Sequence, residues 1–289
     1  MYPQAVPSSQ DQGSSASEED AEEINRDAGC SSTNITSGVI RGQTIGELLS
    51  RPIPPTKYHA YPVIPVKGIV LIGAQPKSYK SFIALNIAYD LAAGRMALDA
   101  WAVDEPKTVL LLEQELGEYR LRDRIDGLHK FRASPIAARN FYYVSKDLVC
   151  KVDSTDGIKN IERHIEGCHP QVIIFDPLIW FHNQDENDNS QMQRVMERFI
   201  GLQEKYGHST IIVHHMGKPG ETRMGYDANS LRGASAVFGA VDSVITVQKP
   251  VQNDPTYLRL HFVLRNTENP FPMDIQLDGA TKTFNRITN

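Results

Sequence analysis

The residues from Gly73 to Ser81 have the types and order of a phosphate-binding loop. The segment reads GAQPKSYKS and is followed by Phe82. Such a loop needs backbone N–H groups that wrap a triphosphate, a lysine that reaches its β- and γ-phosphates, and a hydroxyl that ligates Mg²⁺. Lys80 and Ser81 would fill the last two roles. The nucleotide-binding residues that we predict are Gly73, Ala74, Gln75, Pro76, Lys77, Ser78, Tyr79, Lys80, Ser81 and Phe82.

Two positions of this loop depart from the pattern G-x-x-x-x-G-K-[ST]. Ala74 stands at the first glycine position, one residue after Gly73, and Tyr79 stands at the second, directly before Lys80. A tyrosine adopts a left-handed backbone poorly, so the loop either differs locally from the pattern or carries strain. The alternative interpretation is an ordinary turn between a strand and a helix, with a solvated lysine.

Acidic residues follow two of the apolar segments. Glu113 and Glu115 come after one of them, and Asp176 comes after another. A carboxylate beside a γ-phosphate can orient the attacking water as a general base, and we assign this role to Glu115, beyond the strand end, rather than to Glu113. An acid at the end of a buried strand is costly unless it meets a cation, so we assign Asp176 and Ser81 to a Mg²⁺ site. Solvated loop acids and a turn cap are the alternatives.

Two adjacent histidines, His214 and His215, follow a further apolar segment. At a strand end they could donate hydrogen bonds to a γ-phosphate, although a structural role is equally common for either one. No companion cluster of cysteine or histidine accompanies them, so we do not assign a metal to this pair. The residues that follow, 217–230, are polar and glycine-rich and have the length of a functional loop.

Apolar runs and helical patterns alternate along the chain. The runs with the character of buried strands are 68–73, 108–112, 141–144, 172–175 and 210–213. Helical spacing follows them at 81–93, 121–128, 158–165 and 192–199, and residues from Asp242 onward read as shorter strands. This alternation predicts an α/β fold, with a mostly parallel sheet, helices on both faces and additional C-terminal strands. Ligands bind beyond the carboxyl ends of such strands.

The first 45 residues differ in composition from the rest. They hold seven acidic and two basic residues, which account for the whole net charge of −5. With few large apolar groups, this segment cannot offset its ordering entropy, so we expect a disordered acidic tail over 1–45 and one folded domain over 46–289. The neutral remainder excludes a broad basic surface, so any nucleic-acid site must be a local loop or channel.

Several classes of protein do not fit the sequence. No apolar run reaches the roughly 18 residues that span a membrane, and the N-terminus lacks the apolar segment of a secretory signal. Cys30, Cys150 and Cys168 are too widely spaced for a zinc site or a disulfide framework. They fit a reducing compartment, so we expect a cytoplasmic protein without a membrane partner.

Taken together, these residues resemble the RepA-like branch of the RecA-fold P-loop ATPases, a family of hexameric helicases. The resemblance runs from about Ile45 to about Arg265. It rests on the loop at 73–81, VLLLEQE with Arg124 downstream, VIIFDPL around Asp176, VHHMGK at 213–218, and LRGASAVFGAVDSVI at 231–245.

This resemblance implies a RecA-like core that binds ATP and Mg²⁺, with the sensor strand lying between the Walker A and Walker B strands. Glu115 would be the catalytic base, and His214 and His215 would sense the γ-phosphate. Arg232 would be an arginine finger that reaches a neighbour's ATP, since no second cation is evident within the chain itself. The partners would be a homo-oligomer, as a hexameric ring, and single-stranded nucleic acid in a channel lined by 217–230.

Three functions therefore stay open. The first is a ring ATPase that moves along or remodels nucleic acid, in the replication of a plasmid, phage or mobile element. The second is an ATP-dependent assembly switch of the KaiC or recombination-mediator kind, which hydrolyses ATP slowly. The third is a module that binds ATP without cleaving it. Stimulation of ATP hydrolysis by polynucleotide separates the first from the second, and phosphate release separates both from the third.

Overall fold

A computed structural model describes residues 42–146, 150–216, 234–251 and 253–288 of the chain, which divides into two units between Pro54 and Pro55. The tail expected over 1–45, up to residue 41, and the segment 217–233 with Arg232 lie outside the described residues. In the first unit, the short helix α1 (Ile45–Leu49) begins at a capping box made by Thr44 and Glu47. The connector expected from Arg51 has no regular secondary structure up to Lys57.

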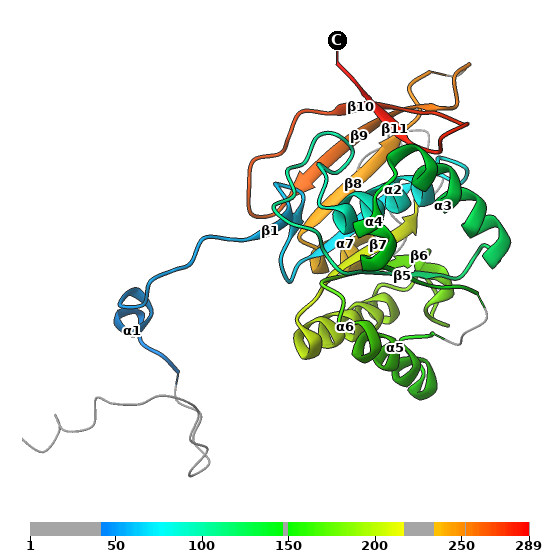
Figure 1. The fold of residues 1–289 in the computed structure, drawn as a ribbon. Helices are drawn as coiled ribbons and strands as arrows, with labels where there is room; N and C mark the ends of the chain where they lie inside the picture. The colour runs from blue at the N-terminus through cyan, green and yellow to red at the C-terminus, as the bar shows by residue number, and fades with distance from the viewer. Residues whose placement is uncertain (1–41, 147–149, 217–233, 252, 289) are drawn as a thin grey trace, which may run out of the picture. The chain divides into compact units, whose positions relative to one another are not determined.

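The second unit contains one large mixed sheet, shown in Figure 1. Its strands are β3 (Ile69–Ala74), β4 (Val109–Glu113), β5 (Phe141–Val144), β6 (Val172–Asp176), β7 (Ser209–His215), β8 (Ser243–Gln248), β9 (Tyr257–Leu264), β10 (Met273–Leu277) and β11 (Phe284–Ile287). Their order is β11-β10-β9-β8-β3-β7-β6-β4-β5. The strands from β8 to β5 pair in parallel, and β9, β10 and β11 extend the sheet in antiparallel pairs. The expected fold class is therefore confirmed, including the additional C-terminal strands.

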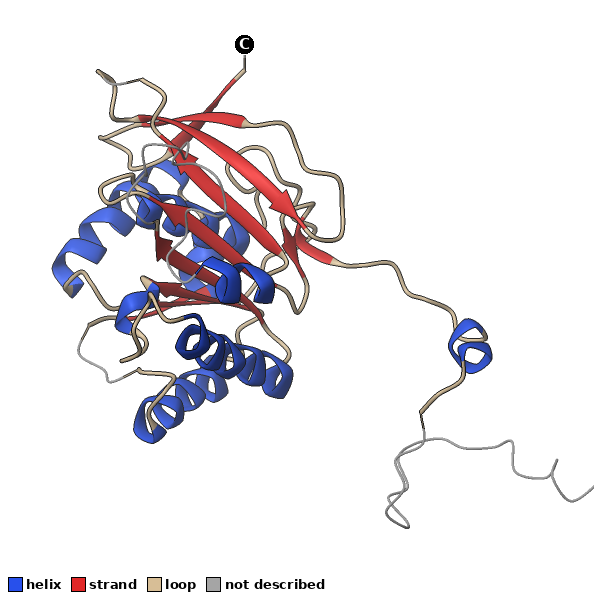
Figure 2. Ribbon diagram, turned by 180° about the vertical axis from the view of Figure 1, so that it is seen from behind, coloured by secondary structure: helices blue, strands red, loops and turns tan. Residues whose placement is uncertain are grey.

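Helices cover both faces of this sheet (Figures 1 and 2). They are α2 (Lys80–Ala93), α3 (Glu118–Arg132) and α4 (Pro135–Asn140) on one face, and α5 (Thr155–Cys168), α6 (Asn189–Tyr206) and α7 (Ala234–Ala240) on the other. The alternation of β3 serves both layers, because Val70 and Ile72 pack with α2 while Ile69 and Leu71 pack with α6. A strand that is buried on both faces needs apolar residues at every position.

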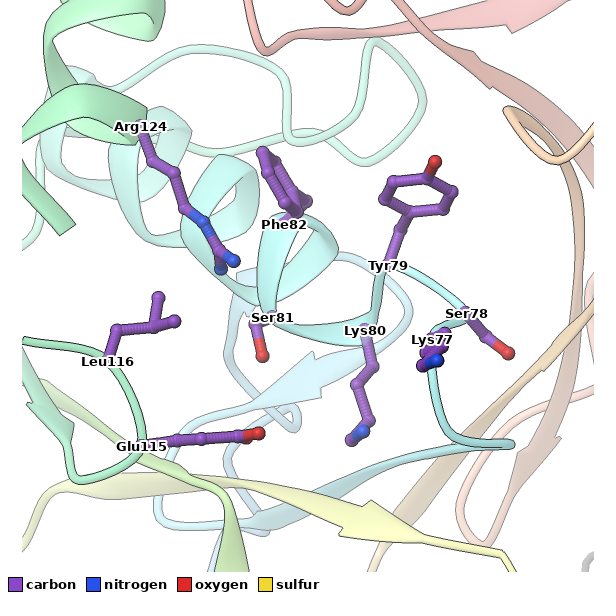
Figure 3. Close-up of a pocket in the computed structure, with 9 residues that line it drawn as sticks. All are labelled: Lys77, Ser78, Tyr79, Lys80, Ser81, Phe82, Glu115, Leu116 and Arg124. Carbon is purple, nitrogen blue, oxygen red and sulfur yellow. The ribbon is translucent and has the colours of Figure 1, made fainter. Parts of the chain in front are cut away.

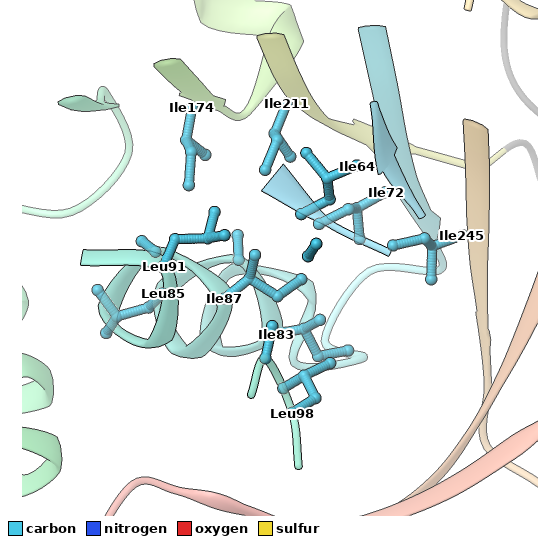
Figure 4. Close-up of a cluster of buried hydrophobic side chains, with 14 of the residues drawn as sticks. Ile64, Ile72, Ile83, Leu85, Ile87, Leu91, Leu98, Ile174, Ile211 and Ile245 are labelled. Atoms are coloured by element: carbon cyan, nitrogen blue, oxygen red, sulfur yellow. The ribbon is translucent and has the colours of Figure 1, made fainter. Parts of the chain in front are cut away.

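The helix α2 is buried because its sequence offers no polar face. Ile83, Ile87 and Leu91 lie against Ile72 and other strand residues in the cluster that Figure 4 shows. The helix ends where expected, at Gly94, which takes a left-handed conformation with φ 66° and donates its N–H to the last turn. The first turn of α2 is thereby fixed relative to the ends of the strands.

Parts of the structure differ from the sequence-based expectation. The strand β5 lies at the sheet edge, and Tyr142 and Tyr143 are exposed, so its apolar run does not mark a strand buried on both faces. The helix α4 and the small sheet of β1 (Tyr58–Ala60) and β2 (Ile64–Pro65) were not expected. The strand β9 has eight residues, and is therefore not one of the shorter strands expected after Asp242.

Among the described residues, no helix has both the length and the apolar character needed to cross a bilayer. Cys150 and Cys168 are free cysteines, and Cys150 is buried.

Candidate nucleotide-binding site

The carboxyl ends of four parallel strands meet at one edge of the sheet. The pairing of β3 with β7 sets Gly73 beside His214 and Ala74 beside His215. The pairing of β4 with β6 sets Glu113 beside Asp176. The sensor strand β7 lies between β3 and β6, as the family resemblance implied. The segments singled out in the sequence therefore converge, although they come from distant parts of the chain.

The phosphate loop joins β3 to α2 and ends on a left-handed residue. Tyr79 is the N-cap of α2, with φ 57° and ψ 19°, and its side chain makes no capping hydrogen bond. Lys77 is also left-handed, with φ 61°. Of the two alternatives for Tyr79, the structure therefore has the strained one, in which a residue with a Cβ takes the conformation that glycine favours.

A pocket of about 300 Å³ opens at this loop (Figure 3). Its lining residues are Lys77, Ser78, Tyr79, Lys80, Ser81, Phe82, Glu115, Leu116 and Arg124. The predicted residues Gly73 and Ala74 are the buried last residues of β3, and Gln75 and Pro76 lead from them into the loop. The start of a helix presents backbone N–H groups to a pocket, which suits a bound phosphate.

The two residues assigned to the metal site are in contact. Ser81 Oγ donates a hydrogen bond of 3.0 Å to Asp176 Oδ1. Burial raises the pKa of Asp176 to about 6, while the bond from Ser81 and the charge of Lys80 oppose that shift. Asp176 therefore meets both a hydroxyl and a cation at its buried strand end, which meets the physical requirement for burying an acid there.

Lys80 is the first residue of α2 and is only 6% exposed. Burial lowers its pKa, and the charges of Asp176 and Glu115 act in the opposite direction. A lysine at a helix start, beside a hydroxyl and a carboxylate, fits a magnesium-bound triphosphate: Lys80 would contact the phosphates, and Ser81 and Asp176 would hold the ion. The ion would neutralise charge on the phosphate oxygens.

The two glutamates after β4 have different surroundings. Glu115 is exposed and lines the pocket, where Figure 3 shows its side chain lying toward Lys80. Glu113 is 2% exposed, and its Oε1 accepts hydrogen bonds from the backbone N–H groups of Glu115 (3.0 Å) and Leu116 (2.7 Å). Burial raises the pKa of Glu113 to about 7, against those two bonds. Glu113 thus shapes the turn that carries Glu115 into the pocket.

Arg124 lines the same pocket, and the sequence analysis did not assign it a role. It lies on α3, with its guanidinium carbon 4.2 Å from the ring centroid of Phe82. The charges of Asp176, Glu113 and Glu115 act on its pKa. The expectation that the chain itself offers no second cation was therefore wrong. Its spacing after VLLLEQE was the available signal, but only the packing of α3 on α2 brings Arg124 to the loop.

The two histidines at the end of β7 are not among the residues that line the pocket. His214 is fully buried, with its Nδ1 3.6 Å from Oε1 of Glu186, and Nε2 of His182 lies 4.0 Å from the same oxygen. In the described part of the chain, no group of three or more histidine, cysteine or acidic side chains could hold a metal ion. The sensor role of His214 and His215 stays a prediction, as does that of Arg232.

Comparison with known proteins agrees with this geometry. A family model described as "AAA domain" matches residues 38–221. Among solved structures, the chain is similar to the ATPase domain of a replicative helicase, with a TM-score of 0.58 and 14% sequence identity over 77% of this chain and 85% of that one. At this identity the likeness shows the fold alone. No curated protein matches the chain.

Proposed function

The chain belongs to the AAA domain family of P-loop ATPases, and from that premise we propose that it is a Mg-ATP-dependent ring ATPase acting on single-stranded nucleic acid. Within the family, the RepA-like replicative helicases and related DNA-remodelling motors are the proposed functional class. The host process would be the replication of a plasmid, phage or mobile element.

The observation that carries the ATPase proposal is the convergence at the strand ends. Lys80 and Ser81 come from α2, Glu115 follows β4, and Asp176 ends β6, and the hydrogen bond from Ser81 to Asp176 joins two of these elements. A phosphate lysine, a metal-ligand pair and an exposed carboxylate are the groups that phosphoryl transfer to water requires.

Each residue has a distinct part in the proposed reaction. Lys80 binds the β- and γ-phosphates, and Ser81 with Asp176 orients the metal-bound phosphate oxygens. Glu115 orients a water molecule in line with the bond that breaks and accepts its proton. Arg124, on the pocket wall beside Phe82, adds positive charge in cis near the phosphates.

The ring and the nucleic acid are supported by the family resemblance of the segments around Arg232 and 217–230. In a ring, Arg232 of one subunit would reach the nucleotide of the next. A charge-neutral body favours nucleic-acid contact at a local loop, and the residues from Gly217 to Ser230 include Lys218 and Arg223.

A second candidate is an ATP-dependent assembly switch with slow hydrolysis, and Tyr79 favours it. A loop with two left-handed residues that have a Cβ, Lys77 and Tyr79, stores strain that can slow a catalytic cycle without preventing nucleotide binding. The two candidates share the pocket and differ in what stimulates it.

Single-stranded DNA separates these candidates. ATP turnover by the full chain is measured with Mg²⁺, alone and with increasing single-stranded DNA, with Lys80→Ala as the inactive control. We expect turnover to rise with DNA for a motor and to stay constant for a switch. No phosphate release under either condition would leave only ATP binding, and no binding of ATP would refute the ATPase proposal altogether.

A further inference from the structure

Both left-handed residues of the phosphate loop are contacted by one side chain from another strand. Lys249 Nζ donates a hydrogen bond to the backbone carbonyl oxygen of Lys77. The same Nζ lies 5.2 Å from the ring centroid of Tyr79, which is within the range of a cation–π contact. Lys77 and Tyr79 have φ angles of 61° and 57°. Lys249 thus contacts the loop at the two positions where its backbone is least favourable.

The sheet holds Lys249 in place relative to the loop. Lys249 follows β8, which pairs in parallel with β3, and Ala74 on β3 lies beside Val247 on β8. The loop starts directly after Ala74. Lys249 and the loop therefore leave neighbouring strands of the same sheet, so the lysine needs no rearrangement of the fold to reach it.

The environment of Lys249 strengthens these contacts. The side chain is half-buried, and burial lowers its pKa. A partly dehydrated ammonium group gains more from a carbonyl oxygen and an aromatic face than a solvated one does. The Tyr79 ring is also supported by Phe82, in an edge-on contact with centroids 5.8 Å apart.

We propose that Lys249 is a positioning residue that holds the phosphate loop in its nucleotide-binding conformation. It compensates for Tyr79, which stands where the common loop pattern has a glycine. A glycine adopts a left-handed backbone without help, whereas a tyrosine there needs an external contact to stay in it. The inference rests on the proposed function, because it concerns the binding of ATP at the same loop.

A different role for Lys249 is direct contact with the phosphates of the nucleotide. Both roles predict weaker ATP binding when the lysine is removed. Only the positioning role predicts that the loss depends on the residue at position 79, because a glycine there removes the strain that Lys249 offsets. A double-mutant cycle over Lys249 and Tyr79 therefore distinguishes the two roles.

The experiment measures the dissociation constant of a fluorescent ATP analogue, with Mg²⁺ present, for the full chain, Lys249→Met, Tyr79→Gly and the double variant. We expect Lys249→Met to weaken binding about tenfold, the size of one charge-assisted hydrogen bond. In the Tyr79→Gly background, the same change should cost less than about twofold. Steady-state turnover of Lys249→Met should show a raised KM with little change in kcat.

Two further variants complete the test. Lys249→Arg keeps the charge and both contacts and should retain most of the affinity, whereas Lys159→Met removes an exposed lysine of α5 and should change nothing. Thermal denaturation of each variant checks that it folds. An equal loss in both backgrounds would overturn the positioning role, as would a parent that binds ATP and is unaffected by Lys249→Met. A parent that binds no ATP refutes the proposed function itself.

Discussion

Ser81 Oγ and Asp176 Oδ1 are joined by a hydrogen bond of 3.0 Å, which links the first turn of α2 to the end of β6. A bound Mg²⁺ would take Ser81 Oγ as a ligand, with Asp176 fixing its orientation. Ser81→Ala should therefore raise the Mg²⁺ concentration for half-maximal ATP hydrolysis by about 10- to 100-fold. Asp176→Asn should act in the same direction. Titration of Mg²⁺ at fixed ATP measures this, with Ser190→Ala on α6 as the control; an unchanged titration curve would remove Ser81 from the metal site.

Lys80 is the buried cation at the start of α2. Lys80→Ala should reduce ATP turnover by about 10²-fold or more, since it removes a charge that stabilises the transition state. Binding of ATP should also weaken, while the melting temperature stays close to that of the parent. Phosphate release and thermal denaturation measure the two effects. Unaltered turnover would refute the assignment of the phosphate loop.

The two glutamates after β4 have separable roles. Glu115→Gln should bind ATP normally and hydrolyse it about 10²-fold more slowly, because it removes a base. Glu113→Gln should act mainly through the turn that Glu113 holds by its bonds to the backbone of Glu115 and Leu116. Single-turnover hydrolysis with measured ATP affinity compares them. If Glu113→Gln alone showed the hydrolysis defect, the base would be Glu113.

Glu113 should make the stability of the protein depend on pH. Burial raises its pKa from 4.5 to about 7, so between these values the folded state keeps a proton that the unfolded state has lost. The free energy of unfolding contributed by Glu113 therefore falls as pH rises through this window. Glu113→Gln should flatten the pH dependence across that window, as measured by denaturant unfolding. An identical slope in parent and variant would contradict the raised pKa.

The contribution of a neighbouring subunit can be tested by mixing variants. Arg232→Ala keeps the phosphate site, and Lys80→Ala keeps Arg232, so each should be nearly inactive alone. An arginine finger in trans is worth about 10³-fold or more, so co-assembly should partly restore activity. Subunit exchange is verified with labelled protein. Exchange without recovery would refute a finger in trans, and a matching loss in Arg124→Ala would then assign the second cation to the pocket wall.

The sequence predicted the elements whose signals are local. The run of apolar residues ending at Gly73, the loop lysine and the all-apolar helix closed by Gly94 follow one another along a single stretch of chain, and the structure has them as β3, the loop and α2. Capping glycines and apolar periodicity act within a segment, so they can be read before the segment's partners are known.

Other features depended on contacts between distant residues. The edge position of β5 left Tyr142 and Tyr143 exposed despite their apolar character, because a strand is buried on both faces only when it has neighbours and helices around it. The packing of α3 brought Arg124 to the pocket, and strand pairing turned His214 toward Glu186.

By itself the sequence determined that a phosphate loop stands between a strand and a helix, and that acids follow later strands of an α/β sheet. Only the tertiary structure decided that Tyr79 is left-handed, that Lys249 contacts it, and that Ser81 meets Asp176 across 95 residues of chain. The physical reason is that strand order and helix packing set the distance between such groups. That distance is a property of the whole fold, whereas a motif specifies only its own segment.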